Sequence, residues 1–423
     1  MSPMSRRQAL ALLGVLPLAS RLGAQTRVGP RHRVFLGTLH GFLLEPGGVL
    51  QTWHMGAPRP EDGGAPDWLG LGHNRPLAEY TLAPVPDLKD VVAAAAGDAC
   101  SFAVLQDGRL LSWGSNAGKG LLGTTPLAVV EVTASWGPSS NTPVSPLGKF
   151  DAVGVSSQDA HVLALSRDGN VYAWGKGDKG QLGIGPLPII NFRGSLPGRM
   201  AYVPFPVRIP NLGDVTAISA GRTHSLALLK DGTVRAWGEN RVGQVGDGTT
   251  TDRDSPVPVQ GVGNAVAITA AAGDFSAALL ADGTVMTWGG NAHGQLGRPP
   301  WDVDRRTASP IPAPAIGVKG IRAIGAGIAH MIALTQSGTV FSWGDATFGT
   351  LGRAESKTKN PAVVPSLTGV QSIVVHDSTN VAVLANGRIM TWGGVRPWTR
   401  PEGSHDDISP SPILLWLDGL DQP

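Results

Sequence analysis

Side chains able to bind a metal or move a proton recur at one point of a repeating pattern. They lie thirteen residues before each of seven regularly placed tryptophans, at His40, Cys100, His161, His224, Phe275, His330 and Thr379. Four imidazoles at equivalent points of a ring would suit a transition metal. However, equivalent atoms in neighbouring units of a ring are too far apart to share one ion at about 2.0–2.1 Å. We therefore expect no metal and no cofactor, and predict a packing role in which each histidine hydrogen-bonds to backbone.

Other candidates for catalysis are sparse. Charged residues make up only 16% of the chain, and no nucleophile elbow, phosphate-binding loop or zinc-protease motif is present. The carboxylate clusters are Glu61-Asp62, Asp302 with Asp304, and His405-Asp406-Asp407. We interpret each of them as a solvated loop rather than a calcium site or an acid–base pair. The lone Cys100 excludes an internal disulfide and is expected to be a small buried side chain. We predict no catalytic residue.

The tryptophans reveal a sevenfold repeat. They are separated by 49 to 63 residues and comprise Trp53, Trp113, Trp174, Trp237, Trp288, Trp343 and Trp392. Five residues before each stands a glycine, usually preceded by Asp or Asn, as in Asp231-Gly232. Such a dipeptide between two alternating apolar runs predicts a β-hairpin, with both turn residues expected at positive φ. The strict spacing favours a structural role for each indole, packed between repeat units, over carbohydrate stacking.

Each repeat is predicted to hold four short antiparallel strands. In the fourth repeat these are 215–218, 225–229, 234–237 and a proline-marked segment at 256–259, which belongs at a sheet edge. The chain contains 58 Gly and 34 Pro, a composition that disfavours long helices. Seven such sheets can cover one another's faces only by stacking radially. We predict an all-β fold, a seven-bladed β-propeller of four-stranded antiparallel blades, and disfavour an open β-solenoid.

The repeat resembles that of the regulator of chromosome condensation family. The family pattern appears here as Ala220-Gly221, His224, Asp231-Gly232, Trp237-Gly238 and the ending Gly243-Gln244-Val245-Gly246. The resemblance covers residues 31–420 and departs from the pattern at the ends, where Trp53-His54 replaces Trp-Gly and the last repeat lacks the Gly-Gln-Leu-Gly ending. Residues 33–36 read as a complete inner strand and 413–417 as a complete outer one. Whether the two ends share a blade stays open.

The resemblance implies a fold and a binding surface, but no single activity. The founding member exchanges nucleotide on a small nuclear GTPase and touches chromatin. Its exchange-active residues match no motif here, so none is carried over. We expect neither a small GTPase nor nucleic acid as partner. A secreted bacterial propeller of this family that inhibits β-lactamases is similar in the repeated strand-turn-strand core, which leaves the partner unidentified.

The first 24 residues resemble an export signal. A basic start with Arg6 and Arg7 precedes eleven mostly apolar residues, 9–19, which are too few to span a bilayer. The segment 5–10 resembles a bacterial twin-arginine signal, with ordinary secretory export as the alternative. We therefore expect a signal peptide at 1–24 and a single propeller domain at 25–423. Cleavage would leave a nearly neutral periplasmic or secreted monomer, without a membrane span or a basic field for nucleic acid.

Strand order places the most variable loops on one face. In an antiparallel meander the first and third connections of each blade share one face, and the hairpin turns share the other. The third connections carry the aromatic and basic residues from which we predict a binding surface: Trp68, Trp136, Phe192, Trp301, Arg305, Arg306, Phe348 and Trp398. Folding back as loop anchors is the alternative for each aromatic.

Two functions fit the sequence. The first is a non-enzymatic binding scaffold for a protein or a cell-envelope polymer. The alternative is an envelope hydrolase or lyase with a site at the channel mouth on the loop-rich face, which would need a convergent acid–base pair at the axis. The sequence shows only a recurring packing position there, so it favours the scaffold.

Overall fold

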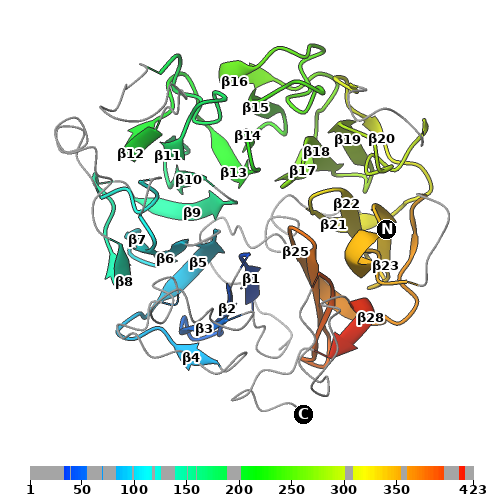
Figure 1. The fold of residues 1–423 in the computed structure, drawn as a ribbon, viewed down its shortest axis with the longest axis horizontal. Helices are drawn as coiled ribbons and strands as arrows, with labels where there is room; N and C mark the ends of the chain where they lie inside the picture. The colour runs from blue at the N-terminus through cyan, green and yellow to red at the C-terminus, as the bar shows by residue number, and fades with distance from the viewer. Residues whose placement is uncertain are drawn as a thin grey trace, which may run out of the picture.

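The computed structural model describes a closed ring of seven four-stranded antiparallel sheets (Figure 1). The described residues are 33–38, 40–54, 69, 82–97, 100–116, 120–124, 139–149, 151–158, 160–187, 202–300, 308–353, 360–394 and 409–414. The predicted seven-bladed β-propeller is confirmed. Within the described residues, no helix combines the length and the hydropathy needed to cross a membrane. The predicted signal peptide lies outside them.

Each blade is a meander of four consecutive strands. Blade 1 comprises β1 (Arg33–Leu36), β2 (His40–Leu44), β3 (Leu50–His54) and β4 (Ala83–Pro84). Blade 2 comprises β5 (Val91–Ala96), β6 (Cys100–Leu105), β7 (Leu110–Gly114) and β8 (Ser140–Val144). Blade 3 comprises β9 (Ala152–Ser157), β10 (His161–Ser166), β11 (Val171–Lys176) and β12 (Tyr202–Arg208). Blade 4 comprises β13 (Val215–Ala220), β14 (His224–Leu229), β15 (Val234–Gly238) and β16 (Arg253–Pro258).

The remaining three blades follow the same order. Blade 5 comprises β17 (Ala265–Ala270), β18 (Phe275–Leu280), β19 (Val285–Gly289) and β20 (Ala313–Pro314). Blade 6 comprises β21 (Ile321–Ala326), β22 (His330–Thr335), β23 (Val340–Gly344) and β24 (Ala362–Val363), with a 3-10 turn, η3 (Thr347–Gly349), between the last two strands. Blade 7 comprises β25 (Val370–His376), β26 (Thr379–Leu384), β27 (Ile389–Gly393) and β28 (Ser409–Leu414).

The hairpin turns differ in detail from the expected two-residue type. In blade 4 the amide of Gly232 donates to the Leu229 carbonyl at 2.9 Å, and the amide of Leu229 donates to the Thr233 carbonyl at 2.9 Å. Only the glycine of the Asp-Gly pair takes a positive φ, at 86°. The connection is therefore a three-residue turn with the glycine in the left-handed region. The expectation that both residues take positive φ was wrong, because Asp231 instead accepts the Thr233 amide through its side chain.

The seven repeat tryptophans are all fully buried in the seams between blades. In blade 4, the indole Nε1 of Trp237 donates to the carbonyl of Gln181 in blade 3 at 2.8 Å. The same bond joins Trp174, Trp288, Trp343 and Trp392 to the preceding blade at 2.8–3.0 Å. A Cβ placed on Gly246 would lie 2.6 Å from Nε1 of Trp288, so the last glycine of the Gly-Gln-Leu-Gly ending leaves room for the next indole.

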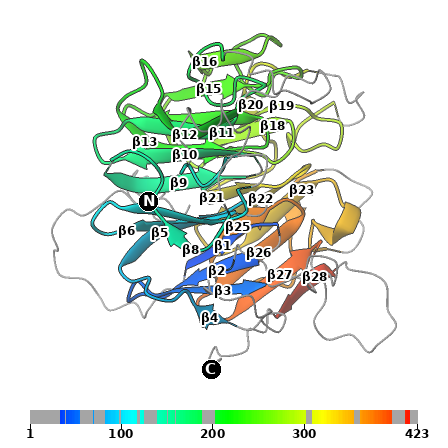
Figure 2. The ribbon, with the colours of Figure 1, turned by 60° about the vertical axis from the view of Figure 1, so that its left-hand side comes forward.

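The ring closes by side-chain packing, without a shared blade. Blade 1 and blade 7 lie side by side (Figures 1 and 2), yet β1 pairs with β2 and β28 pairs with β27. Val34 and Leu36 pack with Val381 and Val383 across this seam. The last outer strand covers Ser409–Leu414, earlier than the expected 413–417, of which residues 415–417 lie outside the described part. The described contacts at the closing seam are therefore mainly apolar.

Candidate interaction surface

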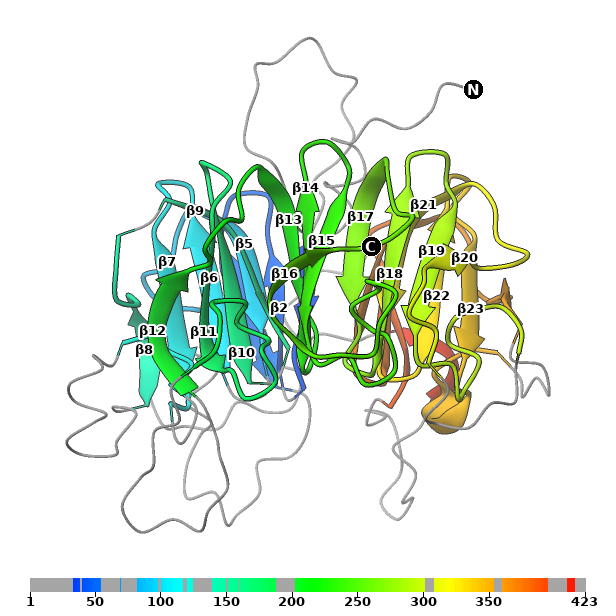
Figure 3. The same ribbon diagram turned by 90° about the horizontal axis from the view of Figure 1, so that it is seen from above.

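The first and third connections of the blades form one face of the disc, which we call the loop face. The hairpin turns and the links between blades form the opposite turn face. Figure 3 shows the blades edge-on, with the orange 3-10 turn η3 of blade 6 on the lower side, which is the loop face in this view. This follows from the antiparallel strand order of every sheet.

One of the eight residues predicted to bind a partner lies within the described part of the chain. Phe348 sits in η3 on the loop face, and 51% of its surface is exposed. The other seven, Trp68, Trp136, Phe192, Trp301, Arg305, Arg306 and Trp398, lie outside the described residues. The loop-face assignment for those seven stays a prediction.

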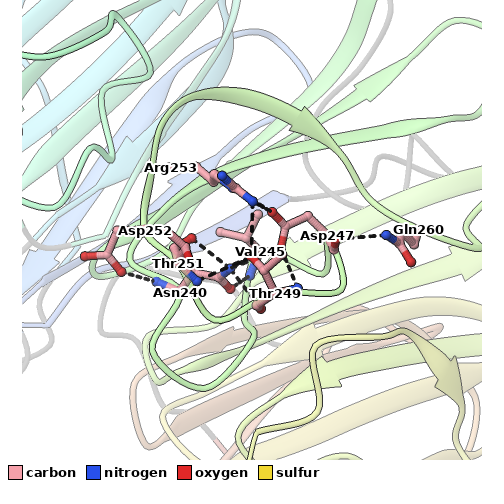
Figure 4. A network of polar contacts seen from close by, with 8 residues as sticks. All are labelled: Asn240, Val245, Asp247, Thr249, Thr251, Asp252, Arg253 and Gln260. Carbon is pink, nitrogen blue, oxygen red and sulfur yellow. Dashed lines mark hydrogen bonds and ion pairs between the residues drawn. The ribbon is translucent and has the colours of Figure 1, made fainter.

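The third connection of blade 4 is built around one buried amide, Asn240 (Figure 4). Its Oδ1 accepts the Val245 amide at 2.9 Å, and its Nδ2 donates to the carbonyls of Thr249 and Thr251 at 3.1 and 3.0 Å. Arg253 bonds the carboxylate of Asp247 at 2.6 Å and ties the end of the loop to its middle. Because these polar groups satisfy one another, the loop holds its shape without an apolar core of its own.

A second amide fixes the start of the same loop. The side-chain Oε1 of Gln244 accepts the Val242 amide at 3.1 Å, and Val242 is buried beneath the loop. Blades 3 and 5 repeat the arrangement, since Gln181 accepts the Lys179 amide and Gln295 accepts the His293 amide, both at 2.8 Å. The Gln of the repeat ending is thus a cap for its own loop.

Blade 6 lacks both amides and folds its loop differently. Ala346 and Thr350 stand where blade 4 has Asn240 and Gln244. Asp345 takes over the start of the loop by accepting the Thr347 amide at 3.0 Å. The chain then makes η3, and Phe348 adopts φ 63° and ψ 17°, in the left-handed region. Among the described residues it is the sole positive-φ position that is neither Gly, Asn nor Asp, which marks a strained backbone.

Charged side chains link the loop face across blades 3 to 5. Glu239 is buried, accepts a hydrogen bond from Thr223 Oγ1 at 2.8 Å and lies 3.8 Å from the Lys179 ammonium. Arg241 is exposed and bonds Asp274 of the next blade at 2.7 Å, which raises the pKa of its guanidinium. Exposed pairs of this kind add about 0–1 kcal/mol each. They position charge on the surface more than they hold the fold.

The histidines of the recurring position join neighbouring blades. Nε2 of His224 lies 2.9 Å from Ser276 Oγ in the next blade, and that hydroxyl donates to the Gln244 carbonyl at 2.8 Å. Because the serine proton goes to the carbonyl, Nε2 of the histidine must be the donor. His40 and His161 meet Ser101 and Ser225 in the same way at 2.7 and 2.8 Å, and His330 meets Asn380 at 2.8 Å.

These contacts correct one expectation and suggest the signal that was missed. The histidines hydrogen-bond to side chains of the next blade, whereas backbone partners were predicted. The partner is always the residue that follows the equivalent position one repeat later, and it is Ser or Asn in all four cases. Burial lowers the pKa of His40 to about 3 and those of His224 and His330 to about 4. These three imidazoles are therefore neutral at pH 7.

A polar cluster spans the channel mouth on the loop face. Gln158 of blade 3 donates to Asp377 Oδ1 of blade 7 at 3.0 Å, and Thr38 of blade 1 donates to Asp377 Oδ2 at 3.4 Å. His376 Nε2 lies 3.2 Å from Thr38 Oγ1 and 3.8 Å from Asp377. The sequence did not suggest this cluster, because its members are up to 339 residues apart.

The geometry of the cluster suits bracing better than catalysis. In a nucleophile–base–acid arrangement, the hydroxyl and the carboxylate face different nitrogens of the imidazole. Here the same Nε2 of His376 faces both Thr38 and Asp377, and both carboxylate oxygens are already engaged. Within the described residues, no three His, Cys, Asp or Glu side chains gather closely enough to hold a metal ion.

A comparison with known protein families matches most of the chain. The family described as "RCC1-like domain" matches residues 62–414. Human probable E3 ubiquitin-protein ligase HERC6 is 34% identical over 343 residues, which cover 78% of this chain and 32% of that protein. Mouse E3 ubiquitin-protein ligase HERC2 is 31% identical over 313 residues, which cover 71% of this chain and 6% of that protein. The chain thus spans a third or less of these relatives.

Solved structures resemble this fold at low sequence identity. Yeast RCC1 (Prp20), in its complex with Kap60, has a TM-score of 0.65 and 21% identity, with 84% of this chain and 82% of that chain covered. Human WBSCR16 has a TM-score of 0.64 and 22% identity, with 86% and 88% covered. These likenesses support the fold alone.

Proposed function

Because this chain belongs to the RCC1-like domain family, we propose that it is a non-enzymatic binding scaffold that holds a partner protein on its loop face. A cell-envelope polymer is the other class of partner compatible with an exported chain. We further propose that residues 1–24 direct export, so that residues 25–423 act in the periplasm or outside the cell. The protein would work there as a nearly neutral monomer.

The observation that carries the proposal is the construction of the loop face. Its described loops are tied down by their own side chains, as Asn240 and Gln244 do in blade 4. The same loops leave Arg241 and Phe348 exposed to a partner. A rigid frame that displays side chains lowers the entropy cost of binding. Binding residues commonly lie on loops mounted in this way.

The known relatives are consistent with a scaffold role. Yeast RCC1, a propeller of the same fold, has been solved bound to another protein, Kap60. The related human and mouse proteins are named ubiquitin ligases, and this chain matches a third or less of their length. Ligase activity therefore forms no part of the proposal.

The proposal is tested by capture from envelope extracts with purified residues 25–423. One variant carries Trp136→Ala, Trp301→Ala and Trp398→Ala on the predicted loop face. A matched variant carries Arg109→Ala, Lys230→Ala and Arg388→Ala, three exposed residues of the turn face. We expect a partner that is captured by the wild type and the turn-face variant, and is lost with the loop-face variant. Equal loss in both variants, or no saturable partner for the wild type, would reject the proposal.

A further inference from the structure

We propose that Ile328 and Phe348, together with Asp345 and Asp377, form a docking patch for a protein segment that carries an apolar side chain beside Lys or Arg. We call these four residues the blade 6–7 patch. The inference rests on the proposed function and adds the place on the loop face and the chemistry of the partner.

The two apolar residues flank one turn of blade 7. The amide of Ile328 donates to the Asp377 carbonyl at 2.9 Å, and the amide of Gly394 donates to the Ser378 carbonyl at 2.9 Å. A Cβ placed on Gly394 would lie 3.9 Å from Cβ of Phe348, so Phe348 stands beside this turn as well. Ile328 and Phe348 are 38% and 51% exposed. Both therefore present apolar surface at the junction of blades 6 and 7.

The fold bears a cost to hold this aromatic ring outward. A bulky residue in the left-handed region costs about 1–3 kcal/mol, and such strain persists where the surrounding structure imposes it. At the corresponding position of blade 4, Val242 avoids the left-handed region and is buried. Aromatic side chains are among the residues that dominate the energy of protein interfaces. Phe348 has the exposure and the fixed backbone of such an anchor.

The charges around the patch select the partner. Asp345 and Asp377 lie on the loop face, with the imidazoles of His293 and His376 at 3.7 and 3.8 Å. The described parts of blades 6 and 7, with the link before blade 6, contain four Lys or Arg residues. Three of them, Lys319, Arg322 and Arg388, belong to the turn-face ends of these blades, and Arg353 is bonded to Ser342 and the Asn360 carbonyl.

An acidic rim around exposed apolar surface fits a basic and apolar segment. The same carboxylates disfavour the phosphates of nucleic acid and of anionic lipid, which are like-charged. A second copy of this chain is disfavoured at the sheet edges because the outer strands carry prolines, as at Pro256 and Pro258 of β16. We therefore assign the patch to a segment of another protein.

The experiment uses the purified protein and a fluorescein-labelled peptide, Gly-Lys-Lys-Leu-Phe-Lys-Lys-Gly, with binding followed by anisotropy. Two control peptides replace either all four Lys by Glu or Leu-Phe by Gly-Gly. We expect saturable binding of the first peptide only, weakened about tenfold by Phe348→Ala and much less by Phe348→Leu. Asp345→Asn is expected to weaken binding at low salt and to reduce its salt dependence.

The matched control is Ile316→Ala, which removes a 58% exposed apolar side chain next to the outer strand of blade 5. It should leave binding unchanged. Equal binding of the Glu peptide, equal binding by Phe348→Ala, or no binding by the wild type would overturn the inference. If the loop-face tryptophan variant loses its partner while Phe348→Ala keeps it, this inference fails and the proposed function stands. If the tryptophan variant keeps every partner, the proposed function itself fails.

Discussion

The third connections of blades 4 and 6 share the repeat pattern and have different surfaces. Both run from a Trp-Gly pair to a glycine that makes room for the next indole. In blade 4, Asn240 and Gln244 absorb the backbone amides and carbonyls of the loop, and Val242 turns inward. In blade 6, Ala346 and Thr350 cannot do this, and Phe348 turns outward.

The difference shows how a repeat protein separates framework from display. The strands, the indole and its carbonyl acceptor are the same in both blades, with Trp288 bonded to Gln244 and Trp392 to Thr350. Backbone bonds of the seam do not depend on which side chain follows the glycine. Two amide side chains decide whether the loop is self-contained. Losing them leaves a loop whose shape comes from its neighbours and whose aromatic residue faces solvent.

The largest effect is expected from removing the amide at the centre of the blade 4 loop. Asn240→Ala deletes bonds to Val245, Thr249 and Thr251 and leaves buried polar groups unsatisfied, so we expect a loss of about 2–4 kcal/mol in unfolding free energy. Thermal and urea unfolding measure it. Ala346→Asn, at the exposed equivalent in blade 6, should change stability by less than about 0.5 kcal/mol. Similar losses in both would erase the contrast between the loops.

The second prediction concerns the seams, where the two blades should behave alike. Burial lowers the pKa of His224 and His330 to about 4, below about 6.5 in the unfolded chain. The unfolded state therefore binds more protons between these values, and stability falls as pH drops from 6.5 towards 4. Each histidine contributes a slope of about 1.4 kcal/mol per pH unit in that window. Urea titrations at several pH values measure the slope.

The matched variants are His224→Gln and His330→Gln, whose amide nitrogen can still donate to the next blade. Each should reduce the slope by about one proton. Unchanged slopes in both variants would show that these imidazoles are already protonated or solvated in the fold. A reduced slope in only one would place a difference between blades 4 and 6 in their seams as well as their loops.

The smallest effect is a change of sign at one loop position. Phe348→Gly removes the left-handed strain and is expected to stabilise the protein by about 0.5–1 kcal/mol, although half of the ring is buried. Val242→Gly, the equivalent in blade 4, should destabilise it by at least about 1 kcal/mol, because a buried side chain is lost. Differential scanning calorimetry compares them. Destabilisation by both would mean that the Phe348 backbone carries no strain.

Much of the fold could be predicted from the sequence because its signals are local and repeated. The spacing of Trp237 and its equivalents, and the Asp-Gly turns, indicated the hairpins and the number of blades. The packing position of His224 was also recognised, although its partner was missed. That partner, Ser276, is 52 residues away and becomes visible only when one repeat is aligned with the next.

The candidate site was less predictable. Phe348 was singled out as an aromatic in a third connection, but its strained backbone depends on Ala346 and Thr350, which replace amides used in other blades. Thr38, Gln158 and Asp377 gave no signal, since each is an ordinary loop residue in a different repeat. Their meeting at the channel mouth requires the ring to be closed.

The sequence by itself determined the repeating unit, because alternation, turn glycines and a fixed indole act over a few residues and specify each blade locally. Only the tertiary structure decided which side chains meet across the ring. The contacts of Asp377 with Thr38 and Gln158, and the packing of Val34 on Val381, join residues that approach when seven blades stack around one axis. Such contacts depend on the closed geometry of the whole ring, which no single repeat encodes.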